Sequence, residues 1–114
     1  MPVKNLAVDV ITASRDASVK TLAETMLEEE LGDLVIAEND KPVGIVTDRD
    51  IALAVARYDD LSDLTAEDVM TSDPVTIHED ATAVDLPATM AEGQVRRIPV
   101  VDDDGTLVGI ATLD

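Results

Sequence analysis

The chain has 114 residues, which is enough for one compact domain or for two small units that share a core. It carries 8 Lys and Arg residues against 25 Asp and Glu residues, giving a formal net charge of −17. A field of this sign repels polyanions, and Tyr58 is the only aromatic residue, so the composition argues against a basic or base-stacking surface for nucleic acids.

The residue types that are missing exclude several kinds of site. The chain has no cysteine, which rules out disulfides, thiolate zinc sites and cysteine nucleophiles. The single histidine, His78, rules out a multi-histidine metal site. Hydrophobic residues make up 46%, which argues against disorder. No apolar run could span a bilayer and no charged-then-apolar leader opens the sequence, so we expect a soluble, cytoplasmic protein that does not bind membranes.

The first half of the chain predicts an extended segment, a helix, two strands and a second helix, in that order. The first helix begins after Ser18, a favourable N-cap residue, and its apolar side chains recur at helical spacing. The extended segment spans 10–13, the strands span 34–37 and 43–46, and the second helix spans 48–58. The strands lack polar alternation, which indicates that both faces of their sheet are covered.

The second half repeats this order after an acidic connector, 59–73, that contains a helical turn near 65–70. Its extended segments are 75–78, 98–101 and 107–111. Pro87 would lose a hydrogen bond inside a helix, so the helix of this half should begin late, after Asp85, with Pro87 in its first turn.

An internal repeat organises the chain, at an offset of about 64 residues. Residues 12–18 match 76–82 in type and order, and one extra turn residue then brings Val-Gly-Ile-Val-Thr at 43–47 onto Val-Gly-Ile-Ala-Thr at 108–112. Chance would not readily keep the order, the spacing and a single insertion together, so the two halves are read as copies of one unit.

These repeats resemble a tandem pair of CBS domains, the Bateman module. The resemblance rests on Gly-Ile-Val-Thr-Asp-Arg-Asp at 44–50, Asp-Val-Met-Thr at 68–71, Pro-Val-Thr-Ile at 74–77 and Arg-Arg-Ile-Pro-Val-Val-Asp at 96–102. It implies an α/β fold of two β-α-β-β-α repeats packed sheet-to-sheet about a pseudo-twofold axis. By this reading the first repeat is 1–60, the connector is 61–74, and the second repeat, 75–114, lacks its last helix.

The resemblance further implies a regulatory module that binds an adenosine-containing nucleotide, such as AMP, ADP, ATP or S-adenosylmethionine, in a cleft between the repeats. The family's Thr-x-x-Asp motif falls on Thr47 and Asp50, whose carboxylate would accept from the ribose hydroxyls. Arg49 in the same turn would contact a phosphate. In the second repeat the motif begins at Thr112, but its aspartate would follow Asp114.

Other candidate ligand contacts follow from the same comparison. They are residues near the first strand, in the central strands and at the repeat junctions: Thr12, Ala13, Val35, Gly44, Thr76, Ile77, Arg97, Ile98 and Pro99. Ala13, Ile77 and Pro99 would form walls around the base, and plain core packing is the alternative for each. For Arg97 the alternatives are a phosphate contact and a surface ion pair of little energetic value.

Two interpretations of Thr47-x-x-Asp50 remain open at the level of sequence. The spacing suits a ribose clamp, and it equally suits a capping box, in which the two residues bond each other's backbone at a helix start. Two explanations of the acidic surface also remain open, namely adaptation to concentrated salt and a simple excess of acidic residues.

No catalytic constellation is present, so we expect neither an enzyme nor a bound cofactor or metal. His78 is expected to face solvent. Asp102-Asp103-Asp104-Gly105 lacks the closing glutamate of a calcium loop and predicts a hairpin turn in which glycine takes a positive φ. Two functions are therefore weighed: an adenosine-ligand sensor that regulates an enzyme or transporter in trans, and a dimerisation module without a ligand. A homodimer is expected in either case.

Overall fold

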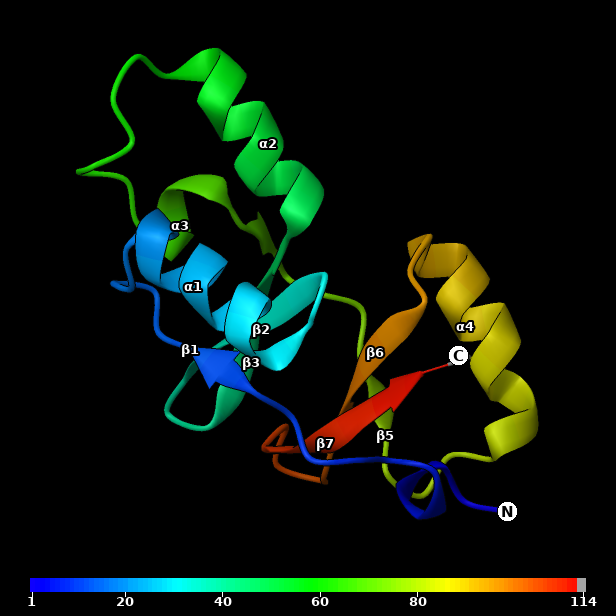
Figure 1. Ribbon diagram of the computed structural model, residues 1–114. Coiled ribbons are helices and arrows are strands. Elements are labelled where there is room, and N and C mark those ends of the chain that lie inside the picture. The colour runs from blue at the N-terminus through cyan, green and yellow to red at the C-terminus, as the bar shows by residue number, and fades with distance from the viewer. Residues whose placement is uncertain (113–114) are drawn as a thin grey trace. The chain divides into compact units, whose positions relative to one another are not determined.

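The computed structural model describes residues 1–112, which form two compact units (Figure 1). Unit 1 comprises Met1–Val10, Asp40–Pro42 and Pro74–Asp114, and unit 2 comprises Ile11–Asn39 and Val43–Asp73. The predicted boundaries of the two repeats and their connector, 1–60, 61–74 and 75–114, divide the chain by sequence similarity and not by spatial contacts, so they stay a prediction. The predicted end of the second repeat, and its lack of a closing helix, lie outside the described residues.

Unit 2 is built on a four-stranded sheet in the order β1-β2-β3-β4. The strands are β1 (Thr12–Ala13), β2 (Asp33–Glu38), β3 (Lys41–Thr47) and β4 (Thr71–Ser72). β1 is parallel to β2, and β4 is antiparallel to β3. The helices are α1 (Val19–Glu29), α2 (Asp48–Arg57) and α3 (Ala66–Val69), and α1 contacts both of the others.

Helix α1 follows the predicted pattern. The Ser18 hydroxyl accepts a hydrogen bond from the Thr21 amide at 3.1 Å, which caps the N-terminus as expected. The helix buries Leu22 and Met26 in a cluster with residues of the sheet and of α3: Leu34, Ile36, Val46 and Ala66. It ends where Glu30 takes a left-handed conformation, φ 56°.

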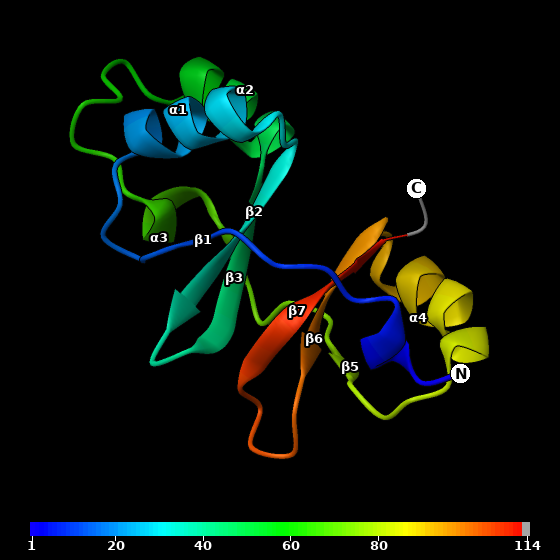
Figure 2. The ribbon, with the colours of Figure 1, turned by 60° about the horizontal axis from the view of Figure 1, so that its bottom comes forward.

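Unit 1 is built on a three-stranded sheet in the order β5-β6-β7, and Figure 2 shows its β6–β7 hairpin beside β5. The strands are β5 (Ile77–His78), β6 (Arg97–Val101) and β7 (Leu107–Thr112). Its helices are the short 3-10 helices η1 (Val3–Asn5) and η2 (Ala83–Asp85), and α4 (Leu86–Gly93). The core joins the sheet to η1 and α4 through Val3, Ile77, Leu86, Met90, Ile98, Val100 and Ala111.

The late start predicted for the second helix is confirmed. The 3-10 helix η2 precedes α4, and Pro87 lies in the first turn of α4, where no intrahelical amide bond is required of it. The predicted hairpin turn is also confirmed, because Gly105 has φ 79° and the Asp102 carboxylate accepts from the amides of Asp104 and Thr106 at 2.9 and 3.0 Å.

The central strands β2 and β6 are buried on both faces, as their apolar sequences predicted. In β2, Leu34 and Ile36 point into the core of unit 2, while Val35 points to the opposite face and is only 2% exposed. In β6, Pro99 alternates with the core residues Ile98 and Val100 and is also buried.

The β2–β3 turn offers a stabilising substitution. Asn39 and Asp40 both have positive φ, 52° and 63°, as a type I′ turn requires. Glycine adopts this conformation without the steric cost that an L side chain carries, so Asp40→Gly should raise the free energy of unfolding by about 0.5–1 kcal/mol. Urea unfolding would measure it, with Asp40→Asn as the charge-matched control. Equal stability of the two variants would refute the backbone explanation.

Candidate functional site

The Thr47–Asp50 motif lies where β3 runs directly into α2. The Asp50 amide donates to Thr47 Oγ1 at 3.1 Å, and the Thr47 amide donates to Asp50 Oδ2 at 2.8 Å. The capping box that the spacing allowed is therefore formed. Since both groups are only half-buried, the cap fixes the carboxylate at the surface of the helix start rather than in the core.

The cap leaves part of the Asp50 carboxylate available. A carboxylate has two oxygens and about four acceptor positions, and the cap uses Oδ2. Within residues 1–112 no other hydrogen bond or ion pair engages this side chain. The capping and ligand-binding interpretations of the motif are therefore chemically compatible.

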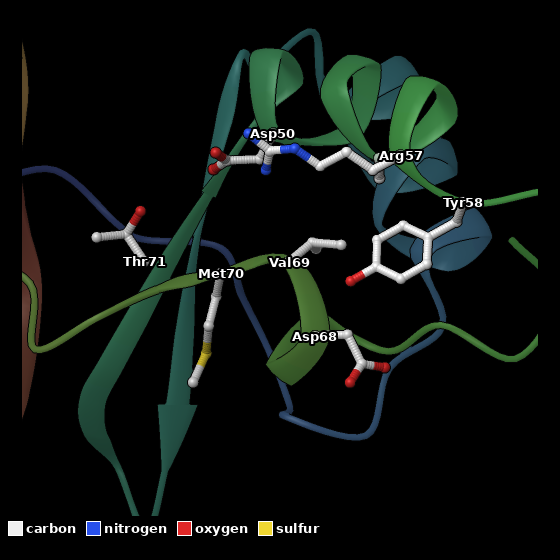
Figure 3. Close-up of a pocket in the computed structure, with 8 residues that line it drawn as sticks. Asp50, Arg57, Tyr58, Asp68, Val69, Met70 and Thr71 are labelled. Atoms are coloured by element: carbon white, nitrogen blue, oxygen red, sulfur yellow. The ribbon is translucent and has the colours of Figure 1, made fainter.

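A cavity of about 240 Å³ in unit 2 lies beside this carboxylate (Figure 3). One wall is made by Asp50, Ala54 and Arg57, which share a face of α2 at spacings of four and seven residues from the first, and by Tyr58, the extended residue that follows the helix. The other wall is the segment Asp68, Val69, Met70 and Thr71, which leads from α3 into β4.

The remaining candidates of the first half lie on the strands of unit 2. Thr12 is exposed and pairs in register with the buried Val35. Ala13 packs against the core of unit 2, which agrees with core packing, the alternative to a ligand contact. Gly44 is buried and leaves room for Met70, because a Cβ on Gly44 would stand 2.9 Å from Met70 Cγ. Arg49 is exposed on the first turn of α2 and does not line the cavity.

The candidates of the second half lie in unit 1. Ile77 and Ile98 are members of its core, so core packing accounts for both, and Pro99 is buried on the opposite face of β6. Thr76 is half-buried just before β5. Arg97 and Thr112 are half-buried partners in the register of β6 and β7. The candidates are thus divided between the two units, and of them only Asp50 lines the cavity.

Sequence reasoning missed Arg57, Asp68, Met70 and Thr71 as residues around Asp50. A signal for Arg57 existed, because it lies seven residues after Asp50 and therefore on the same helix face. The segment from α3 into β4 was marked as a family motif, Asp-Val-Met-Thr at 68–71, but not as a neighbour of Asp50, since β4 is only two residues long and its pairing with β3 is a tertiary feature.

His78 was expected to face solvent, and its side chain is 37% exposed. Its Nε2 lies 2.6 Å from Asp103 Oδ1, while Nδ1 accepts from the Asp80 amide at 3.0 Å. The ring therefore ties the β6–β7 turn to β5. In residues 1–112 no group of three or more His, Cys, Asp or Glu side chains could hold a metal ion.

A second cavity of unit 2, of about 330 Å³, is mainly apolar and lies between α1, α2 and the following loop. Val19, Lys20, Ala23, Ile51, Leu61 and Ser62 line it. In this loop the hydroxyl and the amide of Ser62 both donate to the Asp60 carboxylate. These hydrogen bonds, the hydroxyl's more than the amide's, lower the pKa of Asp60 below its ordinary value of 3.8. None of the motif residues faces this cavity.

The CBS domain family model matches residues 3–57 and 66–114, so it covers both halves of the chain. The chain belongs to the CBS-domain family. The CBS domain-containing protein YhcV of Bacillus subtilis is 30% identical over 108 residues, covering 95% of this chain and 76% of that protein. The uncharacterized protein MK0525 of Methanopyrus kandleri is 36% identical over 107 residues, covering 92% of this chain and 55% of that protein.

Solved structures of CBS pairs share the fold. The CBS domain pair of protein MJ0100, in complex with 5′-methylthioadenosine and S-adenosyl-L-methionine, matches with a TM-score of 0.85 and 32% identity over 98% of this chain and 92% of that one. The CBS domain protein PAE2072 from Pyrobaculum aerophilum, complexed with AMP, matches with a TM-score of 0.87 and 25% identity over 99% of this chain and 88% of that one. The predicted two-repeat CBS fold is confirmed.

Several relatives are longer proteins in which CBS repeats are one part. The chain spans 21% of the length of the inosine-5′-monophosphate dehydrogenase of Korarchaeum cryptofilum, to which it is 35% identical over 104 residues. It spans about half of the Methanopyrus protein, at 55%. None of the helices within residues 1–112 is long and apolar enough to cross a membrane.

Proposed function

We propose that this chain is a regulatory module that binds an adenosine-containing ligand, with AMP, ATP and S-adenosylmethionine as candidates, and is not itself a catalyst. CBS pairs serve as nucleotide-sensing regulatory modules. The observation that carries the proposal for this chain is the Asp50 carboxylate, which is fixed by its cap beside a cavity and has acceptor positions to spare.

The chemistry of this position suits a ribose. Two neighbouring hydroxyls can donate to one carboxylate, and hydrogen bonds to a charged acceptor are stronger than neutral ones. The cap holds Asp50 in one orientation before the ligand arrives, which lowers the entropic cost of binding. The remaining candidates on β1–β3, among them Thr12 and Val35, would contact other parts of the same ligand.

Regulation requires that the ligand distinguish two arrangements of the protein. A ligand that binds both arrangements equally shifts nothing, however tight its binding. We propose that ligand binding biases how this module associates with an enzyme or transporter in trans, or with a second copy of itself.

The test is calorimetric titration with AMP, ADP, ATP and S-adenosylmethionine. Asp50→Ala should weaken binding of whichever compound binds by about 10- to 100-fold, the equivalent of one or two charged hydrogen bonds, and should also remove the cap, at a cost of about 1 kcal/mol in stability. Asp50→Asn is the matched control, since its amide oxygen can keep the cap while the charge is lost.

The two variants separate the roles of the carboxylate. We expect Asp50→Asn to lose most of the affinity and little of the stability. Wild-type affinity in both variants would contradict the ribose clamp. The absence of heat or thermal shift with every compound, for the wild-type chain, would contradict the sensor function.

A second candidate function is a dimerisation module without a ligand. Large apolar side chains lie exposed on three helical segments, with Leu27 79%, Val55 60% and Val84 77% exposed. A second copy that covered such side chains would form a homodimer. Sedimentation over a wide concentration range tests this function, and a monomer at every concentration would contradict it.

A further inference from the structure

The polar cavity next to Asp50 contains one positively charged side chain, Arg57. It lies in the last turn of α2, and Figure 3 shows it extending along the helix toward Asp50. Within residues 1–112 Arg57 makes no ion pair, whereas Arg15 is paired with both Glu38 and Glu67. In a chain with 25 acidic residues, an arginine that lines a cavity without a carboxylate partner is available for an anion from outside.

One oxygen of each carboxylate in the cavity already accepts a hydrogen bond from the backbone. Asp50 Oδ2 accepts from the Thr47 amide at 2.8 Å, and Asp68 Oδ2 accepts from the Thr65 amide at 2.9 Å. Each is thereby held in the capping box of its own helix, α2 or α3, and neither forms an ion pair with Arg57 within residues 1–112.

Tyr58 supplies an aromatic surface for the base of a nucleotide, beside the carboxylate and the arginine. It is the only aromatic residue of the chain, it is 43% exposed, and its ring lies at the cavity beside Val69 (Figure 3). A purine base can stack on such a ring. Asp50, Arg57 and Tyr58 therefore bring an acceptor for ribose, a cation for phosphate and a surface for a base to one cavity.

We infer that this cavity binds a nucleoside monophosphate, that Arg57 binds its phosphate, and that the cavity discriminates against polyphosphates. The inference rests on the proposed function and specifies its ligand. Charge carries the discrimination, because one arginine faces two carboxylates, and each further phosphate would add repulsion without a new partner.

The experiment measures dissociation constants for adenosine, AMP, ADP and ATP at one fixed ionic strength and without divalent cations. The wild-type chain should bind AMP about tenfold or more tightly than adenosine and than ATP. Arg57→Gln should reduce AMP affinity to that of adenosine and leave adenosine affinity unchanged. Lys41→Gln is the control, since it makes the same change in net charge in an exposed residue at the opposite end of β3.

A second readout locates the ligand. Because Tyr58 is the only tyrosine, its ring protons are identified in the NMR spectrum without further substitutions, and they should shift on addition of AMP. Binding of AMP that leaves these signals in place, equal binding of ATP, or loss of AMP affinity in Arg49→Gln instead of Arg57→Gln would each overturn this inference alone. Failure of the wild-type chain to bind any of the four compounds would overturn the inference together with its adenosine-nucleotide premise.

Discussion

Replacing Leu22 by alanine is expected to lower the free energy of unfolding by about 2–5 kcal/mol. Leu22 is fully buried at the centre of unit 2, where it packs with Leu34, Ile36 and Val46. Truncation removes the transfer free energy of its side chain and leaves a void among strands that cannot close around it. A loss of this size is a large fraction of the total stability of a small domain.

The same helix provides the control. Leu27 is 79% exposed on α1, so Leu27→Ala makes an identical chemical change without opening a cavity. Its effect on stability should stay within about 0.5 kcal/mol. Urea unfolding of both variants, followed by circular dichroism, measures the difference. Equal destabilisation would mean that α1 does not pack as described, or that Leu27 is covered by another molecule.

The helix starts were predictable because their signals lie within a few residues of each start. Ser18 and Thr47 are N-cap residues whose side chains accept the expected amides, and Pro87 fixed where α4 begins. These features involve residues within a few positions of one another, so the sequence alone predicts them. The repeat added the long-range information, because it assigned the same order of elements to both halves.

Features that depend on distant partners could not be read in this way. The segment 1–10 packs in unit 1, where the Val3 amide donates to the Ala81 carbonyl at 2.8 Å and Val8 pairs with Ile110. Nothing in the composition of this segment specifies that partner. The pairing of β4 with β3 is of the same kind, and it brings Met70 and Thr71 to the cavity.

The candidate site was predictable only in part for a related reason. The family motif located Thr47 and Asp50, and the structure confirms that they lie together at the start of α2. A motif describes the chemistry that all members share, however, and Arg57 and Tyr58 lie outside it. The place of Arg57 beside Asp50 follows from the helical repeat, whereas that of Tyr58, which is extended just after α2, is a tertiary feature.

The two matched glycines of the repeats, Gly44 and Gly109, should respond differently to alanine. A Cβ on Gly109 would stand 2.9 Å from the Val8 carbonyl oxygen and 3.1 Å from Ala7 Cβ. This backbone cannot retreat without breaking the hydrogen bonds between Val8 and Ile110, each 2.9 Å long. Gly109→Ala should therefore lower the free energy of unfolding by about 1–3 kcal/mol.

At Gly44 the closest atoms belong to the side chain of Met70, with the Thr71 carbonyl oxygen at 3.1 Å. Methionine is flexible and can change rotamer, so Gly44→Ala should cost less than Gly109→Ala. Thermal unfolding of both variants gives the comparison. Equal losses would show that the Met70 side chain is held as firmly as a strand, and no loss at Gly109 would show that the 1–10 segment can leave β7 without cost to the fold.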